Sequence, residues 1–181
     1  EGRARYENRF AAIPEGVPFR PALATPVPNV SGNHTVMARG PIGEEIHTDA
    51  FGRAKVQFHW DREAKGTDED SRWIRVVQET SSSMGLARVG WELSVGYVLG
   101  DPDRPMALAR QINGQMIPSY AQPLNKNVMT IKTETYPGRA GFNELRMDDS
   151  GGTMRIDIHA QKDLSNVVKH DQTETIGNDD T

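Results

Sequence analysis

The chain has 181 residues, a formal net charge of −4 and 36% hydrophobic residues. This slightly acidic balance disfavours nucleic-acid partners, which select for an excess of Lys and Arg. Cysteine is absent, which excludes disulfide bonds, thiolate metal sites and thiol nucleophiles within these residues. No apolar stretch approaches the length of a membrane-spanning helix, so we expect no stable membrane insertion.

The first 29 residues form a proline-rich stretch with widely spaced aromatic residues such as Tyr6, Phe10 and Phe19. Proline removes backbone hydrogen-bond donors and restricts φ, which favours an extended strap over regular secondary structure. We expect residues 1–29 to be the C-terminal end of an upstream hub domain in a longer protein. The alternative interpretation is a disordered tail.

The stretch between Phe51 and Arg62 alternates strictly between apolar and polar residues. Because successive side chains point to opposite faces of a strand, this pattern predicts a half-buried strand. Its polar face would carry Arg53, Lys55, Gln57 and His59, and its inward face would carry Ala54, Val56, Phe58 and Trp60.

Short alternating stretches separated by turn residues fill the region from residue 30 to residue 112. Besides the strand after Phe51, the expected strands are Val30–Arg39, Arg72–Gln78, Ala87–Val89, Trp91–Val98 and Pro105–Ile112. In Trp91–Val98, one face would carry Trp91, Leu93, Val95 and Tyr97. About five short strands joined by turns are typical of a small closed barrel such as the OB-fold, because closure removes exposed sheet edges. The sequence therefore predicts an all-β fold with an OB-fold barrel at residues 30–112.

The last third of the chain separates into a linker and a second strand-forming region. Residues 113–141 lose the alternation and contain several Pro and Gly residues, which indicates a linker. Alternation returns in residues 142–181, around Leu145 and Ile156, and continues over Leu164–Val168 and Thr173–Ile176. These strands are too short and one-sided to form a core by themselves. We expect them to be buried by copies of the same chain or by sequence beyond Thr181.

A stack of strands from several identical chains would hide the apolar side chains on an inner axis. The expected trimer-interface residues are Leu145, Met147, Met154, Ile156, Ile158, Leu164, Val168 and Ile176. Four charged residues would stay solvated on the opposite face, namely Arg146, Asp148, Arg155 and Asp157.

The sequence offers no convincing catalytic, cofactor or metal site. No two histidines have His-x-x-x-His spacing, and no Gly-x-Ser-x-Gly elbow surrounds Ser81-Ser82-Ser83, which we interpret as a flexible loop. Glu44 and Glu45 are adjacent in an extended segment, so their side chains should point to opposite faces. Asp101 and Asp103 lie in a Gly-Asp-Pro-Asp-Arg-Pro turn, where carboxylates accept backbone N–H groups. We therefore expect no catalytic residue, no cofactor and no bound metal.

An OB-fold also raises the alternative of a binding module for an oligonucleotide or an oligosaccharide. Such a module needs a basic groove with exposed aromatic side chains for stacking. Arg53 and Lys55 supply some charge, but Phe58, Trp60 and Trp91 are all expected on inward faces. The sequence therefore disfavours this alternative.

Several long segments occur in the order found in one known family. They are Glu44–Asp49, Gly52–Arg62, Trp73–Val76, Gly100–Pro105, Gly141–Arg146 and Thr173–Asn178. Together they make the chain resemble VgrG, the valine-glycine repeat spike family of bacterial type VI secretion, over nearly its whole length.

This resemblance implies a homotrimeric cell-puncturing spike, similar to the tail spike of contractile phages, that delivers effectors across target envelopes. The barrel would be followed by the start of an intertwined three-chain β-helix or β-prism at residues 142–181. The implied partners are an Hcp tube ring, a PAAR-repeat tip protein and effector or effector-adaptor proteins. The resemblance also implies assembly in the bacterial cytoplasm, followed by secretion or injection, and a mechanical action that needs no active site.

Overall fold

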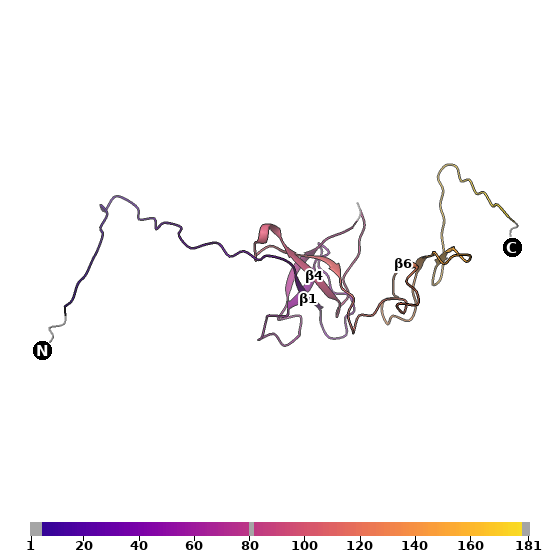
Figure 1. The fold of residues 1–181 in the computed structure, drawn as a ribbon, viewed down its shortest axis with the longest axis horizontal. Helices are drawn as coiled ribbons and strands as arrows, with labels where there is room; N and C mark the ends of the chain where they lie inside the picture. The colour runs from indigo at the N-terminus through magenta and orange to yellow at the C-terminus, as the bar shows by residue number, and fades with distance from the viewer. Residues whose placement is uncertain (1–4, 80–81, 179–181) are drawn as a thin grey trace.

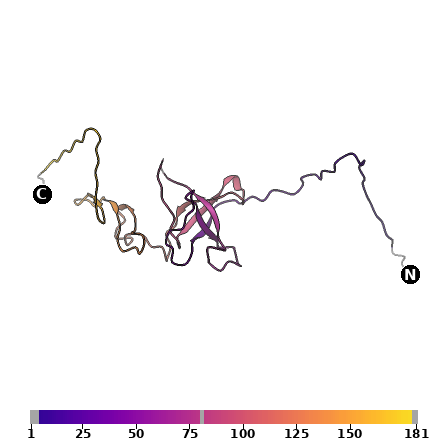
Figure 2. The same ribbon diagram turned by 180° about the vertical axis from the view of Figure 1, so that it is seen from behind.

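The computed structural model describes residues 5–79 and 82–178, which form two β-sheets and no α-helix. One sheet closes into a barrel and the other is a separate three-stranded sheet. The N-terminal strap runs away from the barrel on the side opposite to the second sheet, as both views show (Figures 1 and 2). The predicted all-β class is confirmed.

The barrel has the strand order β1-β2-β3-β5-β4, and β4 pairs with β1 to close it. Its strands are β1 (His34–Arg39), β2 (Ala54–Phe58), β3 (Arg72–Val76), β4 (Glu92–Tyr97) and β5 (Pro105–Arg110). All neighbouring pairs are antiparallel except β3 and β5, which are parallel. A short 3₁₀ turn, η1 (Val98–Gly100), leads from β4 toward β5.

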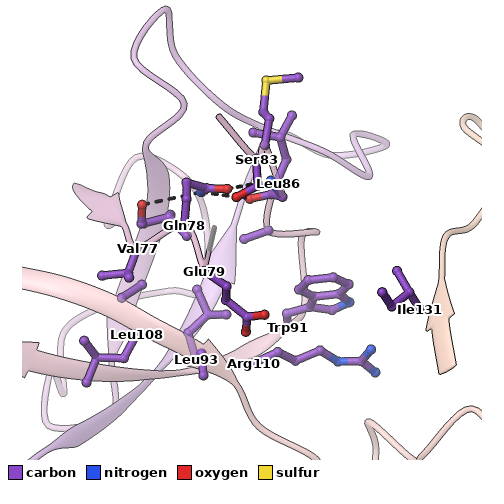
Figure 3. A pocket seen from close by; sticks show the side chains of 16 residues that line it. Val77, Gln78, Glu79, Ser83, Leu86, Trp91, Leu93, Leu108, Arg110 and Ile131 are labelled. Atoms are coloured by element: carbon purple, nitrogen blue, oxygen red, sulfur yellow. Dashed lines mark hydrogen bonds between the residues drawn. The ribbon is translucent and has the colours of Figure 1, made fainter. Parts of the chain in front are cut away.

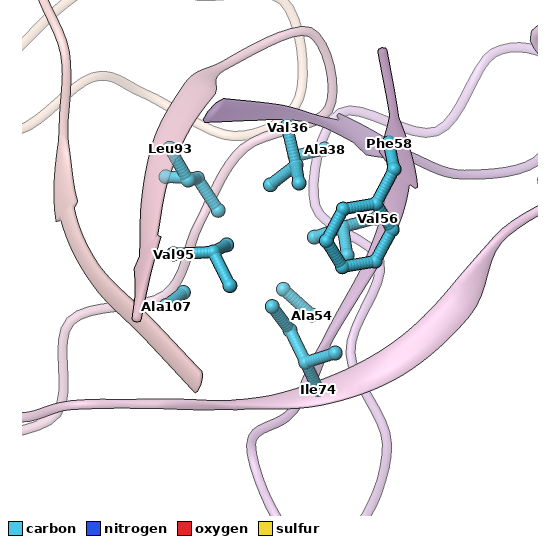
Figure 4. Packing of buried hydrophobic residues seen from close by; sticks show 9 residues of the cluster. All are labelled: Val36, Ala38, Ala54, Val56, Phe58, Ile74, Leu93, Val95 and Ala107. Atoms are coloured by element: carbon cyan, nitrogen blue, oxygen red, sulfur yellow. The ribbon is translucent and has the colours of Figure 1, made fainter. Parts of the chain in front are cut away.

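The barrel core consists of the apolar side chains that alternate inward along these strands (Figure 4). Its buried members are Val36, Ala38, Ala54, Val56, Phe58, Ile74, Leu93, Val95 and Ala107. Trp91 and Tyr97 are half-buried and pack against this cluster. The inward faces predicted for β2 and β4 are therefore confirmed, apart from one residue that was expected to extend β2.

That residue is Trp60, which is 65% exposed. β2 ends at Phe58, and the N–H group of Asp61 donates a hydrogen bond to the carbonyl oxygen of Phe58 at 3.2 Å. The chain thus turns before Trp60 can point inward. Its ring packs instead against that of Phe58 in a tilted arrangement, with centroids 5.1 Å apart.

The other strand predictions differ from the structure mainly at their ends. β1 begins at His34 rather than at Val30, β3 ends at Val76, and β5 ends at Arg110. Residues 87–89 form no strand and contribute only an isolated bridge between Ile46 and Arg88. Local alternation indicates where strands are possible, whereas pairing partners decide where they end.

The second sheet has the order β6-β7-β8, with both pairs antiparallel. Its strands are β6 (Val128–Lys132), β7 (Glu144–Asp148) and β8 (Arg155–His159). β6 lies within residues 113–141, the range predicted as a linker. No strand is assigned to Leu164–Val168 or Thr173–Ile176 in the single chain.

A cluster of charged residues joins the barrel to the loop after β6. Arg88 is 6% exposed, and its guanidinium lies 3.0 Å from a carboxylate oxygen of Glu45. The same guanidinium donates a 2.6 Å hydrogen bond to the carbonyl oxygen of Glu134 and lies 3.6 Å from its carboxylate. Arg139 adds contacts with both carboxylates at 3.9 and 3.6 Å. We call these residues (Glu45, Arg88, Glu134 and Arg139) the joint, because they connect three segments that are distant in sequence.

Replacing Val95 with Ala should destabilise the barrel. Val95 is fully buried, so the change removes apolar contacts and leaves a cavity, at a cost of about 2–3 kcal/mol in the free energy of unfolding. Urea unfolding followed by tryptophan fluorescence measures this loss. The control is Ile42→Ala, because Ile42 is fully exposed and its loss should change stability by less than about 0.5 kcal/mol. Equal stability of the two variants would contradict this assignment of the core.

Replacing Arg88 with Met should weaken the joint. Two carboxylates would lose their buried partner, and we expect a loss of about 2–3 kcal/mol, less than for a wholly buried pair because Glu134 is 45% exposed. Arg104→Met is the matched control, since the ion pair between Arg104 and Asp101 is 64% and 39% exposed and should contribute little. Similar unfolding midpoints for both variants would show that the joint is only a surface ion pair.

Candidate interaction surface

Six apolar side chains lie in two rows on one face of the second sheet. The register places Met129 opposite Met147 and Met147 opposite Ile156. It also places Ile131 opposite Leu145 and Leu145 opposite Ile158. Residues that are directly opposite in an antiparallel pair point to the same face. We call this surface the apolar face (Met129, Ile131, Leu145, Met147, Ile156 and Ile158).

The apolar face is largely uncovered in the single chain. The residues of the two edge strands are the most open, at 59% for Met129, 61% for Ile131, 68% for Ile156 and 67% for Ile158. On the central strand, Leu145 and Met147 are half-buried. Full burial of a side chain of this size contributes about 1.5–3 kcal/mol. Burial of the apolar face by a partner would therefore be strongly favourable.

Four of the eight sequence-predicted interface residues lie outside the strands of the sheet. Leu164 helps to line a hollow of about 430 Å³ over Ile131, Leu145 and Ile158. Val168 and Ile176 lie farther along the chain and are 45% and 54% exposed. Met154 precedes β8 and is 70% exposed. The structure thus brings together Leu145, Met147, Ile156 and Ile158, while the burial of all eight residues stays a prediction.

The opposite face of the sheet is closed within the chain by a buried carboxylate. Glu144 is 8% exposed and accepts hydrogen bonds from the Tyr120 hydroxyl at 2.8 and 3.0 Å. The Thr130 hydroxyl donates a further bond at 2.6 Å. Arg146 lies over the Tyr120 ring at 5.0 Å and pairs with Asp148 at 2.9 Å. Tyr120 therefore covers the polar face.

This cover corrects the expectation that the charged face is solvated. The side chains of Arg146 and Asp148 are only 19% and 16% exposed, whereas Arg155 and Asp157 are 59% and 41% exposed. Sequence reasoning missed Tyr120 and Glu144 as structural partners. Their contact joins positions 24 residues apart, and no local pattern marks it.

The pKa values of the Glu144 carboxyl and the Tyr120 hydroxyl shift in opposite directions. Burial raises the pKa of Glu144. Hydrogen bonds from Thr130 and Tyr120, together with the charges of Lys132 and Arg146, lower this pKa by more than burial raises it, so the net shift is downward. Burial raises the pKa of Tyr120, and its hydrogen bond to Glu144 adds to that rise. Glu144 is thus held ionised and Tyr120 protonated, which keeps the polar face closed near neutral pH.

The acidic residues that could have formed a catalytic pair make hydrogen bonds and ion pairs within the chain. Glu45 belongs to the joint, while a carboxylate oxygen of Glu44 accepts a 3.3 Å hydrogen bond from the Tyr136 hydroxyl. The N–H group of Asp103 donates to the Asp101 carboxylate at 2.9 Å, as expected of a turn. Within residues 5–79 and 82–178, no group of three or more His, Asp or Glu residues is arranged to hold a metal ion. Ser81 of the predicted serine loop lies outside the described residues.

The described part of the chain also contains no helix that is long and apolar enough to cross a membrane.

Comparison with known proteins identifies relatives of both parts of the chain. Residues 129–181 match the family model of the bacteriophage T4 gp5 C-terminal trimerisation domain. The type VI secretion system spike protein VgrG5 of Pseudomonas aeruginosa is 40% identical over 181 residues, covering 98% of this chain. The spike protein VgrG3 of Vibrio cholerae is 39% identical over 98% of this chain. The actin cross-linking toxin VgrG1 of Vibrio cholerae is 38% identical over 94%.

The alignments cover only a small part of these relatives. This chain spans 23% of the length of VgrG5, 18% of VgrG3 and 16% of the actin cross-linking toxin. What the rest of each relative does therefore lies outside the aligned region.

Replacing Glu144 with Gln should change how stability depends on pH. Because folding lowers the pKa of Glu144, its carboxylate stabilises the fold above its ordinary pKa of 4.5, and this contribution is lost as the pH falls through the lower folded value. The variant should be about 1–3 kcal/mol less stable near neutral pH, and the difference should shrink below pH 4.5. Thermal unfolding by circular dichroism across this range measures it. Glu7→Gln, in the exposed strap, is the control, and a pH-independent difference for Glu144→Gln would refute the assignment.

Proposed function

This chain is a relative of the VgrG spike proteins of type VI secretion systems, and we propose that it is a segment of a homotrimeric spike in a bacterial contractile injection apparatus. One observation carries the proposal. The uncovered apolar face lies on β6, β7 and β8, and the match to a trimerisation domain spans the same strands from residue 129 onward. A face that one chain leaves open is what three chains would bury around a common axis.

The domain organisation that supports this function has four parts. Residues 1–29 would end an upstream hub domain, and residues 30–112 would form an OB-fold, which the order β1-β2-β3-β5-β4 of the closed barrel supports. Residues 113–141 would connect the barrel to the needle, which would continue through residues 142–181. The pairing of β6 with β7 supports a connection whose last strand already packs beside the needle.

The needle would be an intertwined three-chain β-helix or β-prism. Residues 160–178 form no strand and are mostly exposed, although they include the apolar residues Leu164, Val168 and Ile176. Strands from the other two copies would supply the missing pairing. The trimer interface proposed here includes these residues together with Leu145, Met147, Met154, Ile156 and Ile158.

The proposed action is mechanical. The spike would sit on an Hcp tube ring, carry a PAAR-repeat protein at its tip and deliver effectors or effector-adaptor proteins across the target envelope. It would assemble in the bacterial cytoplasm before secretion or injection into the target cell. We assign no catalytic residue, cofactor or metal to these residues, and the joint would transmit axial load from barrel to needle.

A binding module for oligonucleotides or oligosaccharides is the alternative, and exposed Trp60 is the observation in its favour. A pocket beside Trp60 is also lined by Asp61, Asp70 and Asp103. These carboxylates disfavour a phosphate backbone, and those of Asp61 and Asp70 already accept hydrogen bonds from backbone N–H groups of their own loop. The spike remains the better-supported function.

Substituting Ile156 and Ile158 together with Asp should dissociate the assembly. The parent chain should show three times the mass of one chain in light scattering, because the apolar face is buried between copies. Two unpaired carboxylates per chain buried in that interface would cost several kcal/mol. The double variant should therefore elute with the mass of one chain.

A control variant adds the same charge away from the apolar face. Gln115 and Thr153 are both exposed, so Gln115→Asp with Thr153→Asp should leave the mass of the assembly unchanged. A trimer that survives the double isoleucine substitution would show that the apolar face is not part of the interface. A parent chain that is monomeric at all concentrations would contradict the proposed function of these residues.

A further inference from the structure

An apolar groove lies between the barrel and the second sheet, outside the face described above. It has a volume of about 480 Å³, and its apolar lining includes Val77, Met84, Leu86, Trp91, Leu108 and Ile131 (Figure 3). Four of these residues come from the segment between β3 and β4, namely Val77, Met84, Leu86 and Trp91, while Leu108 comes from β5 and Ile131 from β6 of the second sheet. The groove is therefore built from both parts of the protein.

The walls of the groove are held in place by specific contacts. Gln78 clamps the loop after β3, because its side-chain oxygen accepts a 2.6 Å hydrogen bond from the N–H group of Gly85 and its amide donates to the Gly85 carbonyl at 3.2 Å. On the opposite wall, the Arg110 guanidinium lies over the Trp91 ring at 4.7 Å. The barrel side of the groove is thus held in shape by contacts within the chain.

Several apolar residues of the groove are open to solvent. Met84 is 80% exposed, Val77 is 43% exposed and Ile131 is 61% exposed. Contiguous exposed apolar side chains of this kind mark surfaces that a partner covers. The groove is therefore a candidate contact surface.

Ile131 connects the groove with the apolar face. Its side chain lines the groove beside Trp91 and also lines the hollow over Leu145 and Ile158 (Figure 3). The two surfaces are therefore continuous through one residue, and that residue lies within the segment matched to a trimerisation domain. A partner that covers the apolar face up to β6 must also approach the groove.

We propose that a second copy of this chain packs into the groove, so that the contact between copies extends from the second sheet onto the barrel. The proposal rests on the homotrimeric spike proposed above. In a three-fold assembly each contact joins two different patches of neighbouring chains. The groove would be one of these patches, and the surface of the next copy at the same level along the axis would be the other. The barrels would then brace one another at the base of the needle.

The absence of cysteine makes a labelling experiment direct. Met84→Cys places a single thiol in the groove, and Ile42→Cys places a control thiol on a barrel loop that is fully exposed and does not line the groove. Each variant of the full chain is reacted with a maleimide, after light scattering has established its mass. In the trimer, the groove thiol should react at least about 10-fold more slowly than the control, because it reacts only when the contact opens. In denaturant the two rates should converge.

The outcomes separate this inference from the function on which it rests. A trimer in which Met84→Cys reacts as fast as Ile42→Cys overturns the groove contact and leaves the trimeric spike intact. A monomeric parent chain overturns both. Slow labelling that persists in a chain diluted to monomers would show that the groove is shielded within one chain, which also overturns the proposal.

Discussion

The structure depends on the contrast between the two faces of the second sheet. Tyr120 and Thr130 satisfy Glu144 on one face, so the chain closes that face by itself. On the other face, the register aligns apolar side chains in rows whose outer members stay largely exposed in the described part of the chain. An isolated sheet of three short strands gains too little from burial to be stable alone. In the proposed trimer, copies of the chain would supply the remaining stabilisation, and the match to a trimerisation domain supports this proposal.

The barrel supplies what the second sheet lacks, namely a closed core. Val36, Val56 and Val95 are almost completely buried, and the pairing of β1 with β4 leaves no open edge in that sheet. The joint then connects the barrel to the loop after β6 through the buried guanidinium of Arg88. A buried Arg with several partners has few alternative arrangements. We infer that it fixes the direction in which the chain leaves the barrel.

Exposed apolar residues occur at both ends of the chain as well as on the apolar face. Tyr6 and Phe10 in the N-terminal strap are 87% and 88% exposed, and Val167 in the tail is 76% exposed. These exposed side chains are consistent with the assembly proposed above. The barrel is the part that can bury its own core, while the strap, the sheet and the groove all present surfaces that suit other chains.

Local alternation in the sequence determined the strand class, the inward faces of β2 and β4 and the apolar residues of β7 and β8, because a period of two reports directly which side chains share a face. Tertiary structure alone decided four other features. β6 lies among Pro and Gly residues and became recognisable through its pairing with β7. Trp60 is exposed because β2 ends two residues earlier. The cover of Glu144 by Tyr120 and the joint at Arg88 connect positions far apart in the chain, and such contacts leave no periodic signal in the sequence.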